Sequence, residues 1–497
     1  MPAADVSYDP RTGSPGGAEP WTSPEAGSAA VHAAAAAADA VASTDPRLRQ
    51  QWLGRVAAAI EADAQSLAAL ADEETGLGLP RLEGEARRAA AQARFYAQVG
   101  AEGSWLGAAL DTVPGPPVVD LRRVNRPVGP VAVFGASNFP FGFGLAGHDT
   151  MSAIAAGCPV VAKAHPAHPR LGAALAAVVS GALAQAGAPD GTFALVRGFD
   201  AGLALVDAPE IAAVAFTGSQ AGGMALAARA AARPRPVPVY AEMGTVNPVV
   251  VTPAGAAARG DEIAQGFVAS FTLGAGQFCT KPGLILVPAG SGLAAAVAAA
   301  VTGAATAPLL TEAIATNARL GVERLVGAGG RVLAVAPGTT VGYGVAPVVL
   351  AAALDDLVPG SPLLEECFGP VALVIEYAGL DQLLGSARRL QPCLAAAIAS
   401  RGPGDPAVPD LVAVLAKLAG RVIVDGWPTG VATTWAQHHG GPWPSTSRPD
   451  ATSVGAAALA RFVRPTAYQD VPEAALPEPI RRDNPWGVPQ RVDGVLR

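Results

Sequence analysis

The chain has 497 residues, of which 51% are hydrophobic and 15% are charged, and its formal net charge is −7 at pH 7. This balance excludes an intrinsically disordered chain and indicates a compact, helix-rich protein with two or three domains. The acidic charge gives nucleic-acid binding no electrostatic support, so we expect no nucleic-acid partner.

The N-terminal quarter is predicted to be a surface segment followed by helices. Residues 1–28 are rich in Pro, Gly, Ser and Thr and lack an apolar signal core, so we expect a flexible segment without a leader. Residues 29–105 place apolar side chains at helical spacing, and their alanine runs favour helices over membrane spans. Prolines within residues 106–125 then predict extended structure. We expect no membrane partner.

Strands and helices alternate from Arg126 onward. The segments VGPVAVFGA, CPVVAKAHP, GTFALVRG and IAAVAFTGS are predicted strands, with helical segments between them. This alternation predicts an α/β fold with a parallel sheet covered on both faces, which binds ligands beyond the carboxyl ends of its strands. A second α/β unit is expected from about residue 243, and the chain after Arg461 is again proline-rich and extended.

The stretch FTLGAGQFCTKPG contains Cys279, the first candidate catalytic residue. The small residues before Cys279 let backbone and substrate approach closely, so its thiol is a candidate nucleophile; an inert, buried thiol is the alternative. The other cysteines are Cys158, Cys367 and Cys393, and none of the four has a CxxC partner or a histidine at metal-ligand spacing. We therefore expect no metal site, no disulfide framework and a reducing, cytoplasmic setting.

Two further residues follow predicted strands or lie within them. Glu242 lies in the apolar strand VYAEMG, where burial raises a carboxyl pKa and suits it to general-base work. The alternative for Glu242 is a salt bridge to Arg233 or Arg235. Asn138 follows the strand VAVFGA and could donate its amide to an oxyanion; the alternative is a plain turn residue.

A turn between a strand and a helix is the fourth candidate. Its residues, Phe216, Thr217, Gly218 and Ser219, could present backbone N–H groups to a phosphate. The turn is not the GxGxxG fingerprint, so this signal is weak on its own.

Nine segments in order resemble blocks of the aldehyde dehydrogenase superfamily: RPVGPVAVFGASNFPF, GCPVVAKAHP, AFTGS, AEMGTVNPVV, GQFCTKPG, LLEECFGPV, GRVIVDGWPTGV, HHGGPWPST and TSVGAAALARFVRP. The forms AEMG…NP, GQFCTKPG and AHPAHP are most similar to the 2-oxoglutarate semialdehyde (2,5-dioxopentanoate) dehydrogenases. The NADP-dependent fatty-aldehyde dehydrogenases share part of the pattern.

The resemblance implies a Rossmann-type cofactor domain and a second α/β catalytic domain, together with a small extended oligomerisation element that makes a homodimer or homotetramer. We expect the cofactor domain at residues 29–105 and 126–243, the catalytic domain at 244–435, and the oligomerisation segments at 106–125 and 463–497.

The resemblance also implies roles for single residues. Cys279 matches the nucleophile, Glu242 the general base, and Asn138 an oxyanion donor acting with the Cys279 backbone N–H. Among the cofactor contacts, Lys163 matches the adenosine-ribose lysine, Ser219 in its turn the pyrophosphate contact, and Glu366 and Phe368 the nicotinamide contacts. The implied reaction oxidises an aldehyde through a thiohemiacetal and a thioester, which water hydrolyses to the acid. The presence of Glu242 favours hydrolysis over transfer to coenzyme A.

Cofactor choice follows from the segment after Lys163, which reads AHPAHPR and holds no acid. NAD-preferring relatives often place an acid here for the ribose hydroxyls. A 2′-phosphate would meet no repulsion, and Lys163, His168 or Arg170 could attract it, so we expect NADP, with NAD usable. The alternative for the histidines is a turn at the strand end.

The sequence leaves the substrate and some alternative functions open. An acidic substrate needs a cation, which Arg87, Arg88 or Arg94 could supply unless they are solvated helix charges. The alternative functions are a medium- or long-chain aldehyde dehydrogenase and a catalytically silent nucleotide-binding homologue. A cysteine hydrolase needs a histidine partner, and the six histidines lie in no hydrolase motif. Lys281 and Cys367 receive no role.

Overall fold

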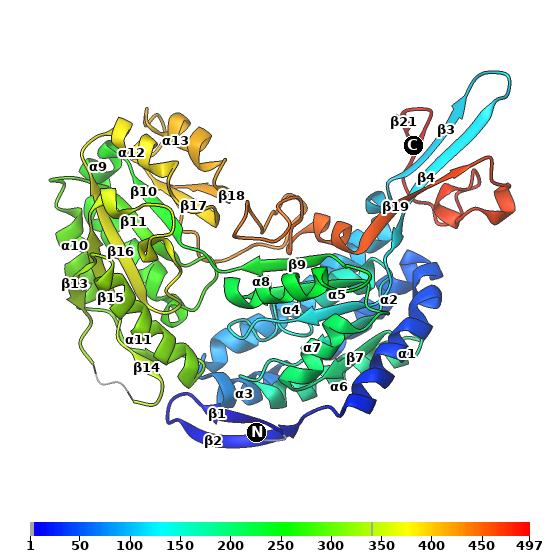
Figure 1. The fold of residues 1–497 in the computed structure, drawn as a ribbon, viewed down its shortest axis with the longest axis horizontal. Coiled ribbons are helices and arrows are strands. Elements are labelled where there is room, and N and C mark those ends of the chain that lie inside the picture. The colour runs from blue at the N-terminus through cyan, green and yellow to red at the C-terminus, as the bar shows by residue number, and fades with distance from the viewer. Residues whose placement is uncertain (1–3, 339–340) are drawn as a thin grey trace.

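The computed structural model describes residues 4–338 and 341–497, which form two α/β units and a protruding β extension (Figure 1). The chain builds the first unit, crosses to the second, and returns past the first into the extension. Within the described residues, none of the helices combines the length and apolarity needed to cross a bilayer.

Residues 4–20 differ from the flexible segment that their composition predicts. They form an antiparallel hairpin of β1 (Ala4–Asp9) and β2 (Ser14–Pro20), and α1 (Pro24–Ser43) already begins at Pro24. The indole N–H of Trp21 donates to Asp5 Oδ1 at 2.8 Å, and the hairpin packs on α3 and α6. Tertiary packing therefore orders a sequence whose own β propensity is low.

Helices fill residues 24–102, as the apolar spacing predicts. After α1 follow α2 (Pro46–Ala62), α3 (Ala64–Thr75) and α4 (Leu79–Glu102). Ser23 and Asp45 cap the first two helices, because their side-chain oxygens accept from backbone N–H groups of the first turn. Trp52, Val56 and Ile60 are buried in the core that these helices share with the first sheet.

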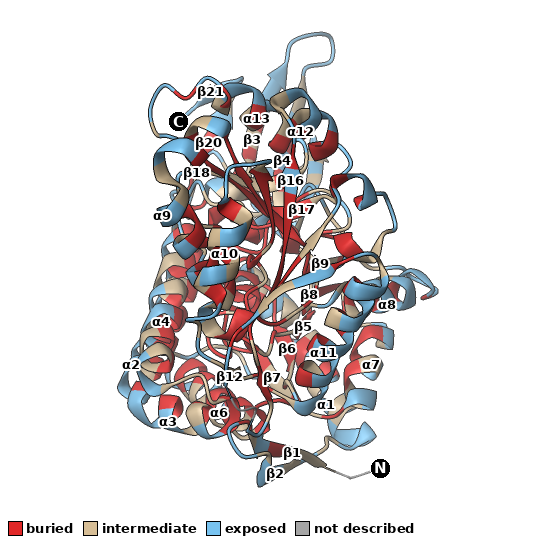
Figure 2. Cartoon of the chain, turned by 90° about the vertical axis from the view of Figure 1, so that its left-hand side faces the viewer, coloured by how far each residue is buried: buried red, intermediate tan, exposed pale blue. Residues whose placement is uncertain are grey.

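The first sheet is parallel throughout, with strand order β7-β6-β5-β8-β9. Its strands are β5 (Val131–Phe134), β6 (Val160–Lys163), β7 (Phe193–Val196), β8 (Ala213–Gly218) and β9 (Val239–Met243). The helices that alternate with these strands along the chain are α5 (His148–Ala155), α6 (Pro169–Gln185), α7 (Phe199–Asp207) and α8 (Gln220–Ala231). Helices cover both faces, and the central strands are almost wholly buried (Figure 2).

The second sheet has seven strands in the order β13-β15-β16-β11-β10-β17-β18, parallel except for β13 against β15. The strands are β10 (Asn247–Val251), β11 (Pro282–Pro288), β13 (Arg331–Val335), β15 (Val348–Ala352), β16 (Val371–Tyr377), β17 (Cys393–Ala399) and β18 (Ala419–Val424). Around it lie α9 (Pro253–Thr272), α10 (Leu293–Val301), α11 (Glu312–Gly327), α12 (Leu380–Ala387) and α13 (Val408–Leu415). A two-stranded sheet pairs β12 (Ala307–Pro308) with β14 (Gly344–Val345).

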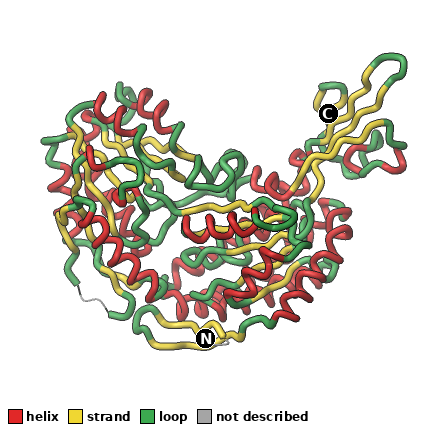
Figure 3. Tube along the Cα trace, in the orientation of Figure 1, coloured by secondary structure: helices red, strands yellow, loops and turns green. Residues whose placement is uncertain are grey.

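The third element is a five-stranded sheet that protrudes from the body, with short 3-10 turns beside its strands (Figure 3). Its order is β19-β4-β3-β20-β21, formed by β3 (Ala108–Val113), β4 (Val119–Pro127), β19 (Val463–Gln469), β20 (Gln490–Val492) and β21 (Val495–Leu496). The extended structure predicted for residues 106–125 and after Arg461 is thus present, and the two segments pair with each other.

Candidate active site

A cavity of about 2150 Å³ lies between the two α/β units. One wall holds the carboxyl ends of β5, β6, β8 and β9, at Phe134, Lys163, Gly218 and Glu242. The opposite wall comes from the second unit and includes Cys279. The N-terminal hairpin adds further lining residues, Val6, Tyr8, Thr12 and Gly13. The ligand site predicted beyond the carboxyl ends of the first sheet therefore matches the cavity.

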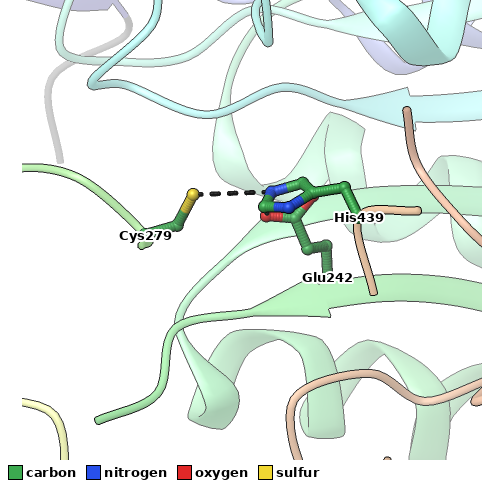
Figure 4. A group of neighbouring side chains, drawn as sticks. All are labelled: Glu242, Cys279 and His439. Carbon is green, nitrogen blue, oxygen red and sulfur yellow. Dashed lines mark hydrogen bonds and ion pairs between the residues drawn. The ribbon is translucent and has the colours of Figure 1, made fainter. Parts of the chain in front are cut away.

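Cys279, Glu242 and His439 meet at this cavity (Figure 4). The Nε2 atom of His439 lies 3.6 Å from Cys279 Sγ and 2.9 Å from Glu242 Oε1. His439 and Glu242 are almost fully buried, whereas Cys279 is partly exposed. A thiol, an imidazole and a carboxylate within contact distance can pass a proton and form a covalent bond to a substrate.

The backbone explains how His439, 160 residues after Cys279, reaches this position. The segment after it pairs with β9, because the Met243 N–H donates to the Ser445 carbonyl at 2.9 Å and the Ala241 N–H donates to Ser447 Oγ at 2.9 Å. Sequence reasoning missed His439, since only this long-range pairing brings it beside Glu242.

The loop before Cys279 depends on small residues. Gly274, Ala275 and Gly276 all have positive φ, in the 3-10 turn η2 (Leu273–Gly276). A Cβ on Gly276 would overlap the carbonyl of Gly369, so the close approach of two backbones requires glycine. The next residue, Gln277, is buried, and its Oε1 accepts from the Leu310 N–H at 2.9 Å.

Asn138 is held against the segment that carries the nucleophile. Its Nδ2 donates to the Gln277 carbonyl at 2.8 Å, and its own carbonyl accepts from Arg81 at 2.7 Å. The Arg81 guanidinium lies 5.1 Å from the ring centre of Phe139 and 5.3 Å from that of Phe278. Arg81 thereby contacts the chain at two places, next to Asn138 and next to Cys279.

Electrostatics keep the resting thiol protonated. Burial raises the pKa of Cys279 well above its usual value, and the carboxylates of Glu242 and Glu366 raise it further. Burial also pushes the pKa of Glu242 upward, but His439, Ser453 and Cys279 outweigh it, so the net pKa is lowered. Ser453 Oγ donates to Glu242 Oε2 at 2.5 Å. Glu242 is therefore a buried carboxylate beside a protonated thiol.

The alternative reading of Glu242 as an arginine salt bridge is not what the structure shows. Arg233 instead donates to the backbone carbonyls of Ile211 and Ala208. Two of the three arginines considered as a cation for an acidic substrate are instead charges on the helix surface. Arg87 pairs with Glu83 at 3.0 Å, and Arg94 pairs with Glu61. Arg88 is exposed on the same helix.

Most residues expected to contact a cofactor line the cavity: Lys163, Phe216, Thr217, Gly218, Ser219, Glu366 and Phe368. Ser219 is the N-cap of α8, and its Oγ accepts from the Gly222 N–H at 3.2 Å. The N-terminus of this 12-residue helix therefore faces the cavity, where its N–H groups suit a phosphate. Burial raises the pKa of Glu366 to about 7.

His168 and Arg170 are not among the residues that line the cavity. His168 is buried at the start of α6, and burial lowers its pKa to about 4, so it carries no charge near neutral pH. Arg170 pairs with Glu73 at 2.8 Å and packs against Gly17 of the hairpin. The idea that these two residues attract a 2′-phosphate is therefore not supported by their positions. His165, which received no role from sequence, does line the cavity.

An acid does lie near Lys163, although none follows it in sequence. Burial lowers the pKa of Lys163, and the charge of Asp5 partly offsets that effect. Asp5 belongs to the N-terminal hairpin, and its Oδ2 is buried and has no hydrogen-bond partner among the described residues. Local sequence could not reveal this acid, because the hairpin precedes Lys163 by more than a hundred residues.

Lys281 and Cys367, which received no role from the sequence, are both buried and hydrogen-bonded to backbone carbonyls. The buried ammonium of Lys281 donates to the carbonyls of Cys367 at 2.7 Å, Gly369 at 3.0 Å and Val371 at 2.8 Å. Cys367 is buried at the cavity edge, with Sγ 3.6 Å from the Ala318 carbonyl. Lys281 thus fixes the loop that carries Glu366 and Phe368.

Comparison with known proteins identifies the family of this chain. Residues 5–440 match the model of the aldehyde dehydrogenase family. The chain is 41% identical to alpha-ketoglutaric semialdehyde dehydrogenase 2 of Azospirillum brasilense, over 98% of this chain and 95% of that protein. It is 40% identical to alpha-ketoglutaric semialdehyde dehydrogenase of Acinetobacter baylyi, over 91% and 88%.

Solved structures share the fold. A putative aldehyde dehydrogenase from Burkholderia cenocepacia superposes with a TM-score of 0.80 at 23% identity, covering 94% of this chain and 96% of that one. An aldehyde dehydrogenase C variant from Pseudomonas syringae, solved with NAD+ and octanal, gives 0.80 and 23%, covering 94% and 93%. At this identity the likeness concerns the fold.

Proposed function

Because the chain belongs to the aldehyde dehydrogenase family, we propose that this NAD(P)-dependent enzyme oxidises 2-oxoglutarate semialdehyde to 2-oxoglutarate. The observation that carries the chemistry is the convergence of Cys279, Glu242 and Asn138 on one cavity. The substrate assignment rests on two relatives, 40% and 41% identical over most of the chain, that are named for this aldehyde. An assembled site of this kind disfavours a catalytically silent homologue.

The first step is the loss of the thiol proton of Cys279. Because its pKa is raised, the thiol needs an acceptor, and the His439 Nε2 atom stands 3.6 Å away with Glu242 behind it. The imidazole takes the proton, and the carboxylate stabilises the resulting positive charge. The thiolate then attacks the aldehyde carbon and forms a thiohemiacetal.

The oxyanion of this adduct needs donors. The Asn138 amide, held 2.8 Å from the Gln277 carbonyl, lies beside the nucleophile's segment and turns toward the oxyanion together with the Cys279 backbone N–H. Arg81 keeps Asn138 in place from the other side. A nicotinamide bound in this cavity would supply the hydride acceptor that converts the thiohemiacetal to a thioester on Cys279.

Glu242 completes the reaction. Its carboxylate, oriented by Ser453 at 2.5 Å, takes a proton from water, which attacks the thioester carbon. The tetrahedral adduct then breaks its bond to sulfur and releases the carboxylic acid, and the Cys279 thiolate takes back the proton held by His439. A base beside the acyl group therefore supports hydrolysis, without coenzyme A as acceptor.

The cavity fits a dinucleotide. The N-terminus of α8 suits the pyrophosphate, and Lys163 and Glu366 stand where hydroxyl groups of two riboses can be held. Gly244 matters here, because a Cβ at this position would overlap the Glu366 carboxylate. Glu366 therefore packs directly on the backbone beneath the nicotinamide end.

For the cofactor we propose NADP, with NAD usable. Lys163 supplies a cation to the cavity, and the segment AHPAHPR that follows it holds no acid. The acids among the lining residues are Glu242, Glu312, Glu365 and Glu366. Asp5 lies behind this wall and weakens the preference, so its removal is a direct test.

We also propose a homodimer or homotetramer assembled through the β extension. The hairpin β3–β4 protrudes from the body (Figure 1) and exposes Val113, Val118 and Leu121. Exposed apolar side chains on a protruding strand pair suit contact with another copy of the chain. Light scattering of the wild type and of Val118→Asp measures this directly.

The deciding experiment for the reaction compares aldehydes with both cofactors while reduced nicotinamide is followed. We expect kcat/KM for 2-oxoglutarate semialdehyde to exceed that for octanal by tenfold or more, about 1.4 kcal/mol in transition-state binding. Equal or higher efficiency on octanal would favour the medium- or long-chain alternative. Cys279→Ala protein should be inactive on every aldehyde.

A further inference from the structure

We propose that Glu242, Cys279 and His439 form a binding site for a thiophilic divalent cation, Zn²⁺ foremost, whose occupancy reversibly blocks the enzyme. One ligand atom from each side chain lies within 4.8 Å of the others (Figure 4). Thiolate, imidazole and carboxylate are the three ligand types of protein zinc sites. The oxidation of an aldehyde uses none of this metal chemistry.

The spacing of the ligand atoms supports a tetrahedral ion. Zinc bonds of about 2.3 Å to sulfur and about 2.0–2.1 Å to nitrogen place the two atoms roughly 3.6 Å apart at a tetrahedral angle. The separation of Cys279 Sγ and His439 Nε2 is 3.6 Å. The 2.9 Å between Nε2 and Glu242 Oε1 must widen by roughly 0.4 Å, to the N···O separation expected around the same ion. That change is within the reach of a side-chain rotation.

The surroundings hold the ligands in place. Ser453 Oγ donates to the far oxygen of Glu242, and the His439 backbone N–H donates to Thr452 Oγ1 at 2.8 Å. Such outer contacts fix ligand orientation and strengthen metal binding. Cys279 and Glu242 both line the cavity, which gives the ion a route in.

Charge also favours a divalent cation. Binding displaces the thiol proton of Cys279, so thiolate and carboxylate together neutralise a charge of +2 in a buried site. An occupied site has no free nucleophile and no free base. Inhibition therefore follows from binding, and removal of the ion by a chelator restores both groups.

The test measures binding on the full-length protein without substrate, so its outcome does not depend on the proposed substrate. Zn²⁺ titration calorimetry gives stoichiometry and affinity, and Co²⁺ in place of Zn²⁺ gives an absorption band from cobalt–thiolate charge transfer. The variants are Cys279→Ala, His439→Asn and the matched control His438→Asn, which removes the neighbouring, half-buried histidine. Circular dichroism checks that each variant is folded.

We expect one Zn²⁺ per chain, a cobalt–thiolate band, and loss of activity that a chelator reverses while Mg²⁺ has no effect. Cys279→Ala should lose the band, and His439→Asn should bind Zn²⁺ at least tenfold more weakly than the His438→Asn control. The proposal fails if His439→Asn and His438→Asn bind alike, if the band persists in Cys279→Ala, or if the wild type shows no band.

Discussion

The ammonium of Lys281 donates to the backbone carbonyl of Cys367 at 2.7 Å, and so joins the segment that carries Cys279 to the loop that carries Glu366. Two more carbonyls, of Gly369 and Val371, accept from the same ammonium. Lys281 lies two residues after Cys279, and Cys367 directly follows Glu366. One buried cation thus holds the Cys279 segment against the loop that carries Glu366.

Lys281→Met should loosen this loop and weaken cofactor binding. Three buried carbonyls lose their donor, which costs about 3–5 kcal/mol of stability. We expect a lower melting temperature and a KM for the cofactor raised tenfold or more. Lys417→Met on the exposed surface is the control and should change neither quantity. An unchanged cofactor KM in a destabilised Lys281→Met protein would separate folding from loop positioning and contradict the assignment.

Asn138→Ala should reduce kcat by roughly 100- to 1,000-fold, the usual loss on removing one oxyanion donor. The fold should survive, because the amide makes one hydrogen bond to the Gln277 carbonyl. Steady-state kinetics and a thermal melt measure the two effects. A kcat within tenfold of the wild type would remove Asn138 from the oxyanion site.

Arg81→Met should lower kcat without unfolding the protein. The variant loses the hydrogen bond to the Asn138 carbonyl and two cation–π contacts, each worth about 0.5–2 kcal/mol. We expect kcat to fall about tenfold, with little change in cofactor KM. Arg87→Met, on the same helix but paired with Glu83 at the surface, is the matched control. Equal rates in both variants would show that Arg81 does not position the site.

Glu366 makes the cofactor-free protein less stable as the pH rises. Its folded-state pKa of about 7 lies above the ordinary value of 4.5, so the folded state holds this proton more tightly than the unfolded state. Stability from this group is complete below about pH 4.5 and is lost as the pH rises to about 7. At pH 8, Glu366→Gln should therefore be more stable by up to about 3 kcal/mol. Urea unfolding of Glu366→Gln against the exposed neighbour Glu365→Gln, at pH 5 and pH 8, measures this; a gain equal at both pH values would contradict it.

Asp5→Asn should shift cofactor preference toward NADP. Removing one acid near Lys163 lowers the repulsion of a 2′-phosphate by about 1 kcal/mol, which corresponds to a roughly fivefold change. The readout is the ratio of kcat/KM for NADP to that for NAD. Asp9→Asn, on the same hairpin and paired with Arg11, is the control. If the ratio falls or stays constant, Asp5 does not act on the adenosine end.

The sequence singled out candidate residues from their local context. Cys279 among small residues, Glu242 in an apolar strand and Asn138 at a strand end all line one cavity. The alternation of strands and helices likewise predicted both α/β units. Periodicity and strand ends are local signals, and parallel sheets turn them into common edges.

Relations between distant segments could not be predicted in the same way. His439 reaches Glu242 only through pairing beside β9, and Asp5 reaches Lys163 only through the folded hairpin. Conversely, His168 and Arg170 follow Lys163 closely, yet neither lines the cavity, because sequence proximity does not set side-chain direction at the start of a helix. Lys281 needed the carbonyls of Cys367, Gly369 and Val371 before its role was visible.

Glu242 and Cys279, the proposed base and nucleophile, stand on different halves of the molecule. Glu242 is on the last strand of the first sheet, and Cys279 precedes the second strand of the other unit. Three residues separate Met243, the end of β9, from Asn247, where β10 begins. A rotation of one unit against the other therefore changes the gap between proton acceptor and thiol before it disturbs either core. The separation of Glu242 and Cys279 therefore depends on how the two units are docked. A mutation far from the cavity that shifts this docking should first change the rate of thioester hydrolysis.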